Sequence, residues 1–227
     1  MPTEIPAQLS LSRLFQLISP SLPIGGYTYS QGIEWAVEQG WISNQQDVKS
    51  WIGGLLETTI QYQELPLLIR MLHAWSDDDL ETLQYWNRWL IASRETFELR
   101  QEESNRARAF TQVLVSLDAS AEQVKPYLLQ SQTACFGYAC NQWQVSEADA
   151  CNGFVWGWLE NLVLSAVKII PLGQTAGQRL VFELSEMLPE IIEQALLISD
   201  DDIGCSSMAM SIASAQHETQ YTRLFRS

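Results

Sequence analysis

The side chains that usually perform chemistry are scarce in this sequence. Its 227 residues contain only two histidines, His73 and His217. No nucleophile elbow, phosphate-binding loop or His-Glu-x-x-His zinc motif occurs. Glu218 follows His217 and could share a metal ion with it, although hydrogen bonding or packing is the simpler interpretation. We therefore predict a protein that is not an enzyme and that has no cofactor or metal site.

The four cysteines, at positions 135, 140, 151 and 205, do not suggest a metal or disulfide site. None of them forms a Cys-x-x-Cys pair, and Cys135 and Cys140 lie on different faces of a helix because they are five residues apart. We expect buried, reduced thiols of the kind found in cytosolic proteins.

The chain is strongly acidic, with a formal net charge of -14. Such a surface repels phosphate backbones and anionic lipids, so we expect no nucleic-acid or membrane partner. Basic partner surfaces are favoured, although solubility alone would also account for the charge. The first six residues lack the features of a signal peptide, and no stretch is apolar enough to span a bilayer. We expect a cytoplasmic protein.

A segment rich in proline and glycine, residues 19–35, is the first that stands out. Its composition predicts a sharp loop between two helices, with Ser30 as the cap of the second helix. Tyr27 and Tyr29 add large rings with polar tips. The loop is either a rigid turn whose aromatic rings pack inward or a binding surface, and both interpretations stay open.

The second segment, residues 165–179, carries one lysine in an otherwise apolar stretch. Lys168 either reaches to the surface along its alkyl chain or pairs with a carboxylate, and the former is favoured. Gln174 and Gln178 are four residues apart and therefore share a helical face. Their amides can donate to and accept from a partner backbone.

The third segment is the tail, residues 217–227, which has a net charge of +1 on an acidic chain. Its Arg-Leu-Phe-Arg run at 223–226 has the composition of an interface anchor. Chain ends usually fray unless something binds them. The tail should therefore pack on its own domain or become ordered on a partner.

Apolar residues recur at helical spacing almost everywhere, and alternating strand patterns are nearly absent. We predict one all-α domain over residues 1–227, a bundle of roughly eight to ten helices, whose C-terminal part, 205–227, can be mobile. The predicted helices begin at a capping box of Ser43 with Gln46, at Ser76 with Asp79, at Thr96 and at Ser146 with Asp149, with two more near 177–186 and 189–198. The helix that Ser146 opens should end near Ile170, before Pro171.

Together, the three segments resemble the urease accessory protein family UreF. Residues 19–34 match Ser-Pro-x-Leu-Pro-x-Gly-x-Tyr-x-Tyr-Ser-x-Gly-x-Glu, and residues 171–178 match Pro-Leu-Gly-Gln-x-x-Gly-Gln. The ending matches His-Glu-x-x-Tyr-x-Arg-Leu-Phe-Arg-Ser, and residues 92–100 match more weakly. The chain departs from the family at Ala176, where an acid is frequent, and after Arg100, where a glycine is frequent.

The resemblance implies an all-α homodimer without catalysis of its own. Its implied partners are a UreD- or UreH-type urease-binding protein, the GTPase UreG and urease apoprotein, and its implied role couples GTP hydrolysis to nickel insertion. Tyr27 and Arg223 would serve the urease-binding partner or the ordering of the tail, while Glu34 and Lys168 would face the GTPase. The alternative is a direct GTPase activator that supplies one of six arginines between positions 70 and 108.

The candidate partner-binding residues are Tyr27, Tyr29, Ser30, Glu34, Lys168, Gln174, Gln178, His217, Tyr221, Arg223, Leu224 and Phe225.

Overall fold

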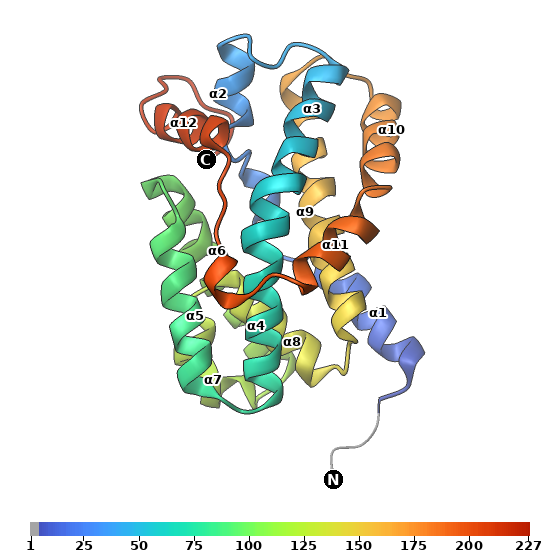
Figure 1. Cartoon of the computed structure of the whole chain (residues 1–227), viewed down its shortest axis with the longest axis vertical. Helices are drawn as coiled ribbons and strands as arrows, with labels where there is room; N and C mark the ends of the chain where they lie inside the picture. The colour runs from blue at the N-terminus through green and yellow to red at the C-terminus, as the bar shows by residue number, and fades with distance from the viewer. Residues whose placement is uncertain (1–4) are drawn as a thin grey trace.

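The structure, a computed structural model, describes residues 5–227. Helices occupy most of this length, and the described residues contain no strand (Figure 1). The prediction of an all-α protein is therefore confirmed. The expectation that the chain does not begin with a signal peptide falls partly on residues 1–4, which lie outside the described residues. In the rest of the chain, no helix is both long enough and apolar enough to cross a membrane.

The α-helices of the described chain are α1 (Ala7–Ile18), α2 (Ile33–Glu38), α3 (Gln45–Leu55), α4 (Leu65–Ser76), α5 (Leu80–Ser93), α6 (Phe97–Leu117), α7 (Ala121–Leu128), α8 (Gln132–Gln142), α9 (Glu147–Ile169), α10 (Gln174–Ser185), α11 (Leu188–Leu196) and α12 (Met208–His217). A π-helix, Leu56–Glu64, joins α3 to α4 without a break. Two short 3₁₀ turns, Gly26–Thr28 and Asp200–Asp202, complete the described secondary structure.

The long helices α4 and α9 form the centre of the bundle. Helix α4 packs against α5, α8 and α9, and α9 also contacts α1, α2, α3, α10 and α11. Apolar side chains on these helices such as Leu67, Met71 and Leu159 are fully buried. Val48 and Ile52 on α3 are also in the core and inaccessible to solvent. Burial of these apolar stripes is the main force that holds the helices together.

Local sequence signals located several helix ends correctly. Thr96 caps α6 by accepting a hydrogen bond from the amide of Leu99, and Ser146 caps α9 by accepting one from the amide of Asp149. Helix α9 ends at Ile169, because Pro171 cannot continue it.

Two predicted caps were wrong by one to three residues. Asn44, not Ser43, caps α3, and the Ser43 hydroxyl instead donates to the Asp47 carboxylate. Ser76 is the last residue of α4, and Asp79 alone caps α5. In both cases a side chain nearer the helix reaches the free amides first.

The four cysteines are free thiols, as expected, but one of them is not buried. Cys135, Cys140 and Cys151 are buried, whereas Cys205 is half-buried. Burial raises the pKa of Cys135 to about 12 and that of Cys151 to about 12. These two thiols therefore stay protonated near neutral pH and are poor nucleophiles.

Helix α6 turns a row of carboxylates toward the interior, and one of them belongs to a buried ionic network. The Arg94 guanidinium binds Glu64, and it lies 3.0 Å from Glu103. Burial raises the pKa of Glu103, against the opposite effect of Arg94. Burial also opposes the charge on Arg94, but the two carboxylates outweigh it and raise the pKa of the guanidinium. The network connects the π-helix to α6 through the segment that follows α5.

Replacement of Arg94 by Met should destabilise the fold strongly, because it leaves Glu64 and Glu103 buried without a cation. We expect a loss of about 3–5 kcal/mol in the free energy of unfolding, measured by urea denaturation near neutral pH. The loss should shrink at acidic pH, where the unpaired carboxyl groups take up protons. The control is Lys125→Met, which removes a surface pair with Glu122 and should cost less than about 1 kcal/mol. Equal losses in the two variants would contradict this account.

Candidate functional site

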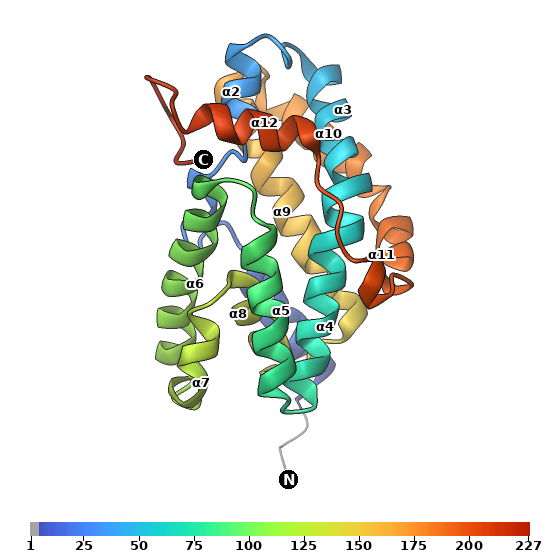
Figure 2. The same cartoon turned by 60° about the vertical axis from the view of Figure 1, so that its left-hand side comes forward.

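The C-terminal tail is docked on the domain, at a site formed by three elements that are distant in sequence. Helix α12 packs against α2 and α6 (Figure 2). The residues after it, 218–227, then return along the loop that leads into α2. The segment between α1 and α2 and the last residues of the chain are therefore neighbours in space.

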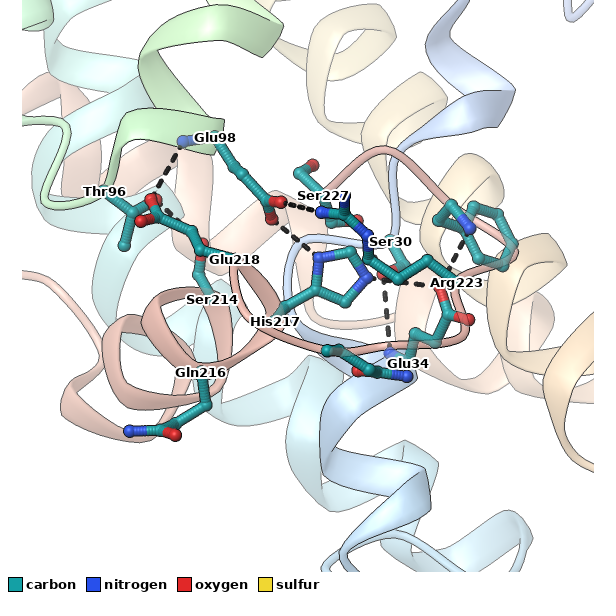
Figure 3. Close-up of polar contacts among 12 residues, drawn as sticks. Ser30, Glu34, Thr96, Glu98, Ser214, Gln216, His217, Glu218, Arg223 and Ser227 are labelled. Carbon is teal, nitrogen blue, oxygen red and sulfur yellow. Dashed lines mark hydrogen bonds and ion pairs between the residues drawn. The ribbon is translucent and has the colours of Figure 1, made fainter.

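His217, the last residue of α12, lies at the centre of this site. Its side chain is completely buried. The ring atom Nδ1 lies 2.6 Å from the Glu98 carboxylate, and Nε2 lies 3.3 Å from the Glu34 carboxylate (Figure 3). Glu34 comes from α2 and Glu98 from α6. The histidine thus connects three helices through polar contacts.

The same two carboxylates hold the tail directly. Glu34 accepts hydrogen bonds from the backbone amides of Leu224, at 2.6 Å, and Phe225, at 2.8 Å. Glu98 accepts one from the Arg223 guanidinium at 2.6 Å. Hydrogen bonds to a charged group are stronger than those between neutral groups. Both glutamates are at least nine-tenths buried, so the tail satisfies groups that water reaches poorly.

The end of the chain makes backbone contacts with the 19–34 loop. The Ser227 carbonyl accepts from the amide of Ser30 at 2.6 Å and from the Ser30 hydroxyl at 2.7 Å. The amide of Arg226 donates to the Thr28 carbonyl at 2.8 Å. Ser30 was predicted to cap α2, but Gly32 occupies the cap position. The Ser30 hydroxyl donates to the tail and also accepts a long hydrogen bond, 3.4 Å, from the amide of Glu34 in the first turn of α2.

Glu218 provides a second attachment, on the other side of His217. Its carboxylate accepts from the amides of Phe97, at 2.7 Å, and Glu98, at 3.2 Å. These are free amides in the first turn of α6, where the helix dipole favours negative charge. A hydrogen bond between Thr96 and Ser214 lies beside it. The tail is therefore attached before and after its exposed bend.

Comparisons with known proteins point to one family. The family model for UreF matches residues 42–185. The chain is 50% identical to the urease accessory protein UreF of Alcanivorax borkumensis over 222 residues, which cover 95% of this chain and 97% of that protein. It is 40% identical to the protein of the same name from Alkalilimnicola ehrlichii, with full coverage of both. The chain belongs to the UreF family. Its relatives are urease accessory proteins by name, which supports a role in urease maturation.

In this UreF family member, some side chains of the 19–35 loop are buried and others are exposed. Tyr29 is buried, and its carbonyl accepts a hydrogen bond from the Ser165 hydroxyl at 3.4 Å. Tyr27 is more than half exposed. The Lys168 ammonium lies 5.8 Å from the centre of the Tyr27 ring and 5.6 Å from that of Phe225, which is within cation–π range. Lys168 is exposed. This agrees with the favoured interpretation, in which its alkyl chain extends to the surface.

A small cavity of about 140 Å³ lies beside the loop and is lined in part by Gln31, Glu102 and Trp158. The Gln31 side chain donates to Glu102 at 3.2 Å and accepts from the Trp158 indole at 2.9 Å. Glu102 also binds Arg106 at 3.0 Å and the Ser227 hydroxyl at 3.2 Å. Gln31 therefore links the loop to α6 and α9 and fixes the surface on which the tail lies.

Two predicted site residues lie apart from the tail. Gln174 and Gln178 are exposed on α10, which packs against α9 and α3. They share a helical face, as expected, but contribute nothing to the cluster around His217. Their partner-binding role remains a prediction.

The six arginines considered for action on a GTPase are not equivalent. Those engaged in ion pairs with carboxylates of this chain are Arg70, Arg94 and Arg106. The exposed ones are Arg88, Arg100 and Arg108. An arginine that acts on another protein must extend from the surface of its own. The three exposed arginines therefore fit the alternative of a GTPase activator better.

Residue spacing does not reveal the partners of the tail, above all Glu98 and Glu102. Glu98 is separated from His217 by 119 positions, and no spacing rule relates the two. The one available signal was its place in the 92–100 segment, which matches the family weakly.

The Glu34 carboxylate should be essential for docking of the tail. In Glu34→Ala, the amides of Leu224 and Phe225 lose their acceptor. Hydrogen bonds to a charged group contribute about 1.5–3 kcal/mol each, so we expect trypsin to cleave after Arg223 and Arg226 at least about tenfold faster. Mass spectrometry of the products reports the site of cleavage.

The matched control is Glu38→Ala, on the exposed face of the same helix. This variant should be cleaved like the unmodified chain. If Glu34→Ala were cleaved no faster than Glu38→Ala, the tail would not depend on this carboxylate.

Gly32 should tolerate no side chain, because it combines a left-handed backbone with close packing. Its φ is +84°, and an added Cβ would lie 3.0 Å from the Ser214 amide nitrogen on α12. Gly40 has a similar φ of +74° with open space around it. Gly40→Ala should therefore cost about 1–2 kcal/mol from its backbone alone. Gly32→Ala should cost more and should also accelerate trypsin cleavage of the tail, whereas equal effects would contradict a packing role.

Proposed function

We propose that this chain is an adaptor in urease maturation. It bridges a UreD- or UreH-type urease-binding protein and the GTPase UreG, and it couples GTP hydrolysis to insertion of nickel into urease apoprotein. We further propose that it acts in the cytoplasm as a homodimer. The family relationship supports the general role, and the docked tail supports the part that concerns partner binding.

The observation that carries this proposal is the exposed bend of an otherwise anchored tail. Tyr221 is fully exposed, and Leu224 is about two-thirds exposed (66%). Their neighbours are held by Glu218, Glu34 and Glu98 through the contacts described above. Large side chains on an anchored backbone can bind a partner with little further loss of conformational entropy. Tyrosine is also among the residues that contribute most to interfaces.

In this proposal Glu34 has an indirect role: it holds the tail in place and does not itself contact a partner. It is buried and already accepts hydrogen bonds from two tail amides. Tyr27 and Lys168 are exposed next to Phe225, so they extend the surface that the tail presents. The role of Lys168 toward the GTPase is part of the proposal.

The test is co-purification of the full-length chain with urease apoprotein, the urease-binding accessory protein and the GTPase, with and without nucleotide. Tyr221→Ala and Leu224→Ala remove exposed groups only, so the fold should be unchanged. The double variant should lose at least about tenfold in affinity, since two central interface side chains typically contribute more than 1.4 kcal/mol.

The control is Leu197→Ala, which removes an equally exposed leucine that follows α11. It should bind like the unmodified chain. Full retention of the complex by the double variant would overturn the proposal that the tail binds a partner, because its exposed side chains would then make no contribution to binding.

A further inference from the structure

The carboxylates on either side of His217 have only donors around them. The Oε2 atom of Glu34 accepts from the amide of Phe225, and its Oε1 atom accepts from the amide of Leu224. The Oε1 atom of Glu98 accepts from Arg223. An ionised carboxylate can only accept hydrogen bonds, and this arrangement of donors matches that form.

Both ring nitrogens of His217 face such oxygens. Nδ1 contacts Oε2 of Glu98, and Nε2 contacts Oε2 of Glu34. A neutral imidazole has one donor and one acceptor nitrogen, so one of its nitrogens would direct a lone pair at a carboxylate. Only the imidazolium ion donates on both sides. A second proton on this ring satisfies both contacts while both carboxylates stay ionised.

The charges of the site lead to the same result. Glu34 from α2 and Glu98 from α6 bring two negative charges, and Arg223 brings one positive charge. The other acids near α12 and α6 have partners elsewhere: Glu218 binds amides of α6, Glu102 binds Arg106, and Glu95 binds the Ser211 hydroxyl. A protonated His217 makes this group of four neutral, in which His217, Glu34 and Glu98 are buried and Arg223 is partly exposed. It also places a cation at the C-terminal end of α12, where the helix dipole favours one.

We propose that His217 is a proton-dependent lock on the C-terminal tail, which holds residues 218–227 on α2 and α6 when protonated and releases them when it loses its proton. Histidine is the side chain whose charge changes between roughly pH 5 and 8 in an unperturbed setting. The stabilising contact is present while the ring holds its proton, so it is lost as the pH rises. Docking therefore weakens toward alkaline pH.

The tail is released because one carboxylate oxygen takes part both in the contact with His217 and in the contact with the tail. Oε2 of Glu34 accepts both from His217 and from the amide of Phe225. When the ring becomes neutral, repulsion at Nδ1 or at Nε2 displaces one carboxylate, and each carboxylate also holds the tail. The lock is a property of the chain alone, so it can be tested without any partner and independently of the proposed adaptor role.

The test uses the fact that the chain has only two histidines. In His73→Gln, the remaining histidine is His217, whose ring nitrogens can be observed by ¹⁵N NMR. His73 lies on the surface in a pair with Glu147, so its replacement should not affect the tail. We expect both ring nitrogens to be protonated while the tail is docked. A neutral ring with a docked tail would overturn the proposal.

Amide hydrogen exchange of Leu224 and Phe225 then measures docking, as protection factors corrected for the intrinsic effect of pH. One linked proton predicts that the tail's docking equilibrium falls by up to about tenfold for each pH unit once the undocked ring has lost its proton, and levels off once the docked ring has lost it too. The fall should be the same in the unmodified chain and in His73→Gln. Protection that stays constant between about pH 6 and 9 would contradict a proton-dependent lock.

Two further variants separate the lock from simple loss of packing. In His217→Gln, the side chain does not titrate, so tail protection should be lower and independent of pH. In Glu34→Gln, the amide oxygen can still accept from Leu224, and an NH2 group in place of Oε2 can donate to a neutral Nε2 but can no longer accept from the amide of Phe225. Protection of Leu224 should therefore depend less on pH than in the unmodified chain, whereas Phe225 should lose protection at every pH. Persistence of the original pH dependence in His217→Gln would assign the titration to another group and overturn the proposal.

Discussion

The need of buried carboxylates for hydrogen-bond donors determines the path of the C-terminal tail over the helices that the apolar core holds in place. A carboxylate removed from water is costly unless donors surround it. Glu34 and Glu98 are buried at fixed positions because α2 and α6 are held by the core. Their donors come from His217, Arg223 and the backbone of the tail. The path of the last residues is therefore determined by two glutamates that lie far away in sequence.

Helix α6 repeats this arrangement along its inner face. Glu98, Glu102 and Glu103 are all buried, although charged residues make up only 18% of the chain. Each has a cationic partner: Arg223 from the tail for Glu98, Arg94 from the segment after α5 for Glu103, and Arg106 from the next turn of α6 itself for Glu102. Buried ion pairs contribute less to stability than apolar packing of equal volume, but loss of one partner is very costly. The pairs of Glu98 and Glu103 therefore specify which segments lie together more than they add to overall stability.

This organisation explains how a tail rich in apolar groups can be ordered and exposed at the same time. The attachments are polar and centre on the buried Glu34 and Glu98, whereas Tyr221 and Leu224 project into solvent. Because ordering does not rest on those two side chains, they are free to contact another molecule. A site of this kind gives an adaptor a binding surface whose presence depends on the state of a few buried polar contacts.

The sequence by itself determined the all-α class, most helix positions, the caps at Thr96 and Ser146 and, through three motifs, the UreF family. Those properties depend on neighbours within one or two helical turns, which residue spacing records. The tertiary structure alone decided that Ser30 binds Ser227, that Glu34 binds the tail and that His217 lies between two carboxylates. These contacts join residues more than 100 positions apart, and a glutamate that will be buried looks the same in the sequence as one that will be solvated. Only packing of the helices removes water from some of them and leaves them dependent on distant donors.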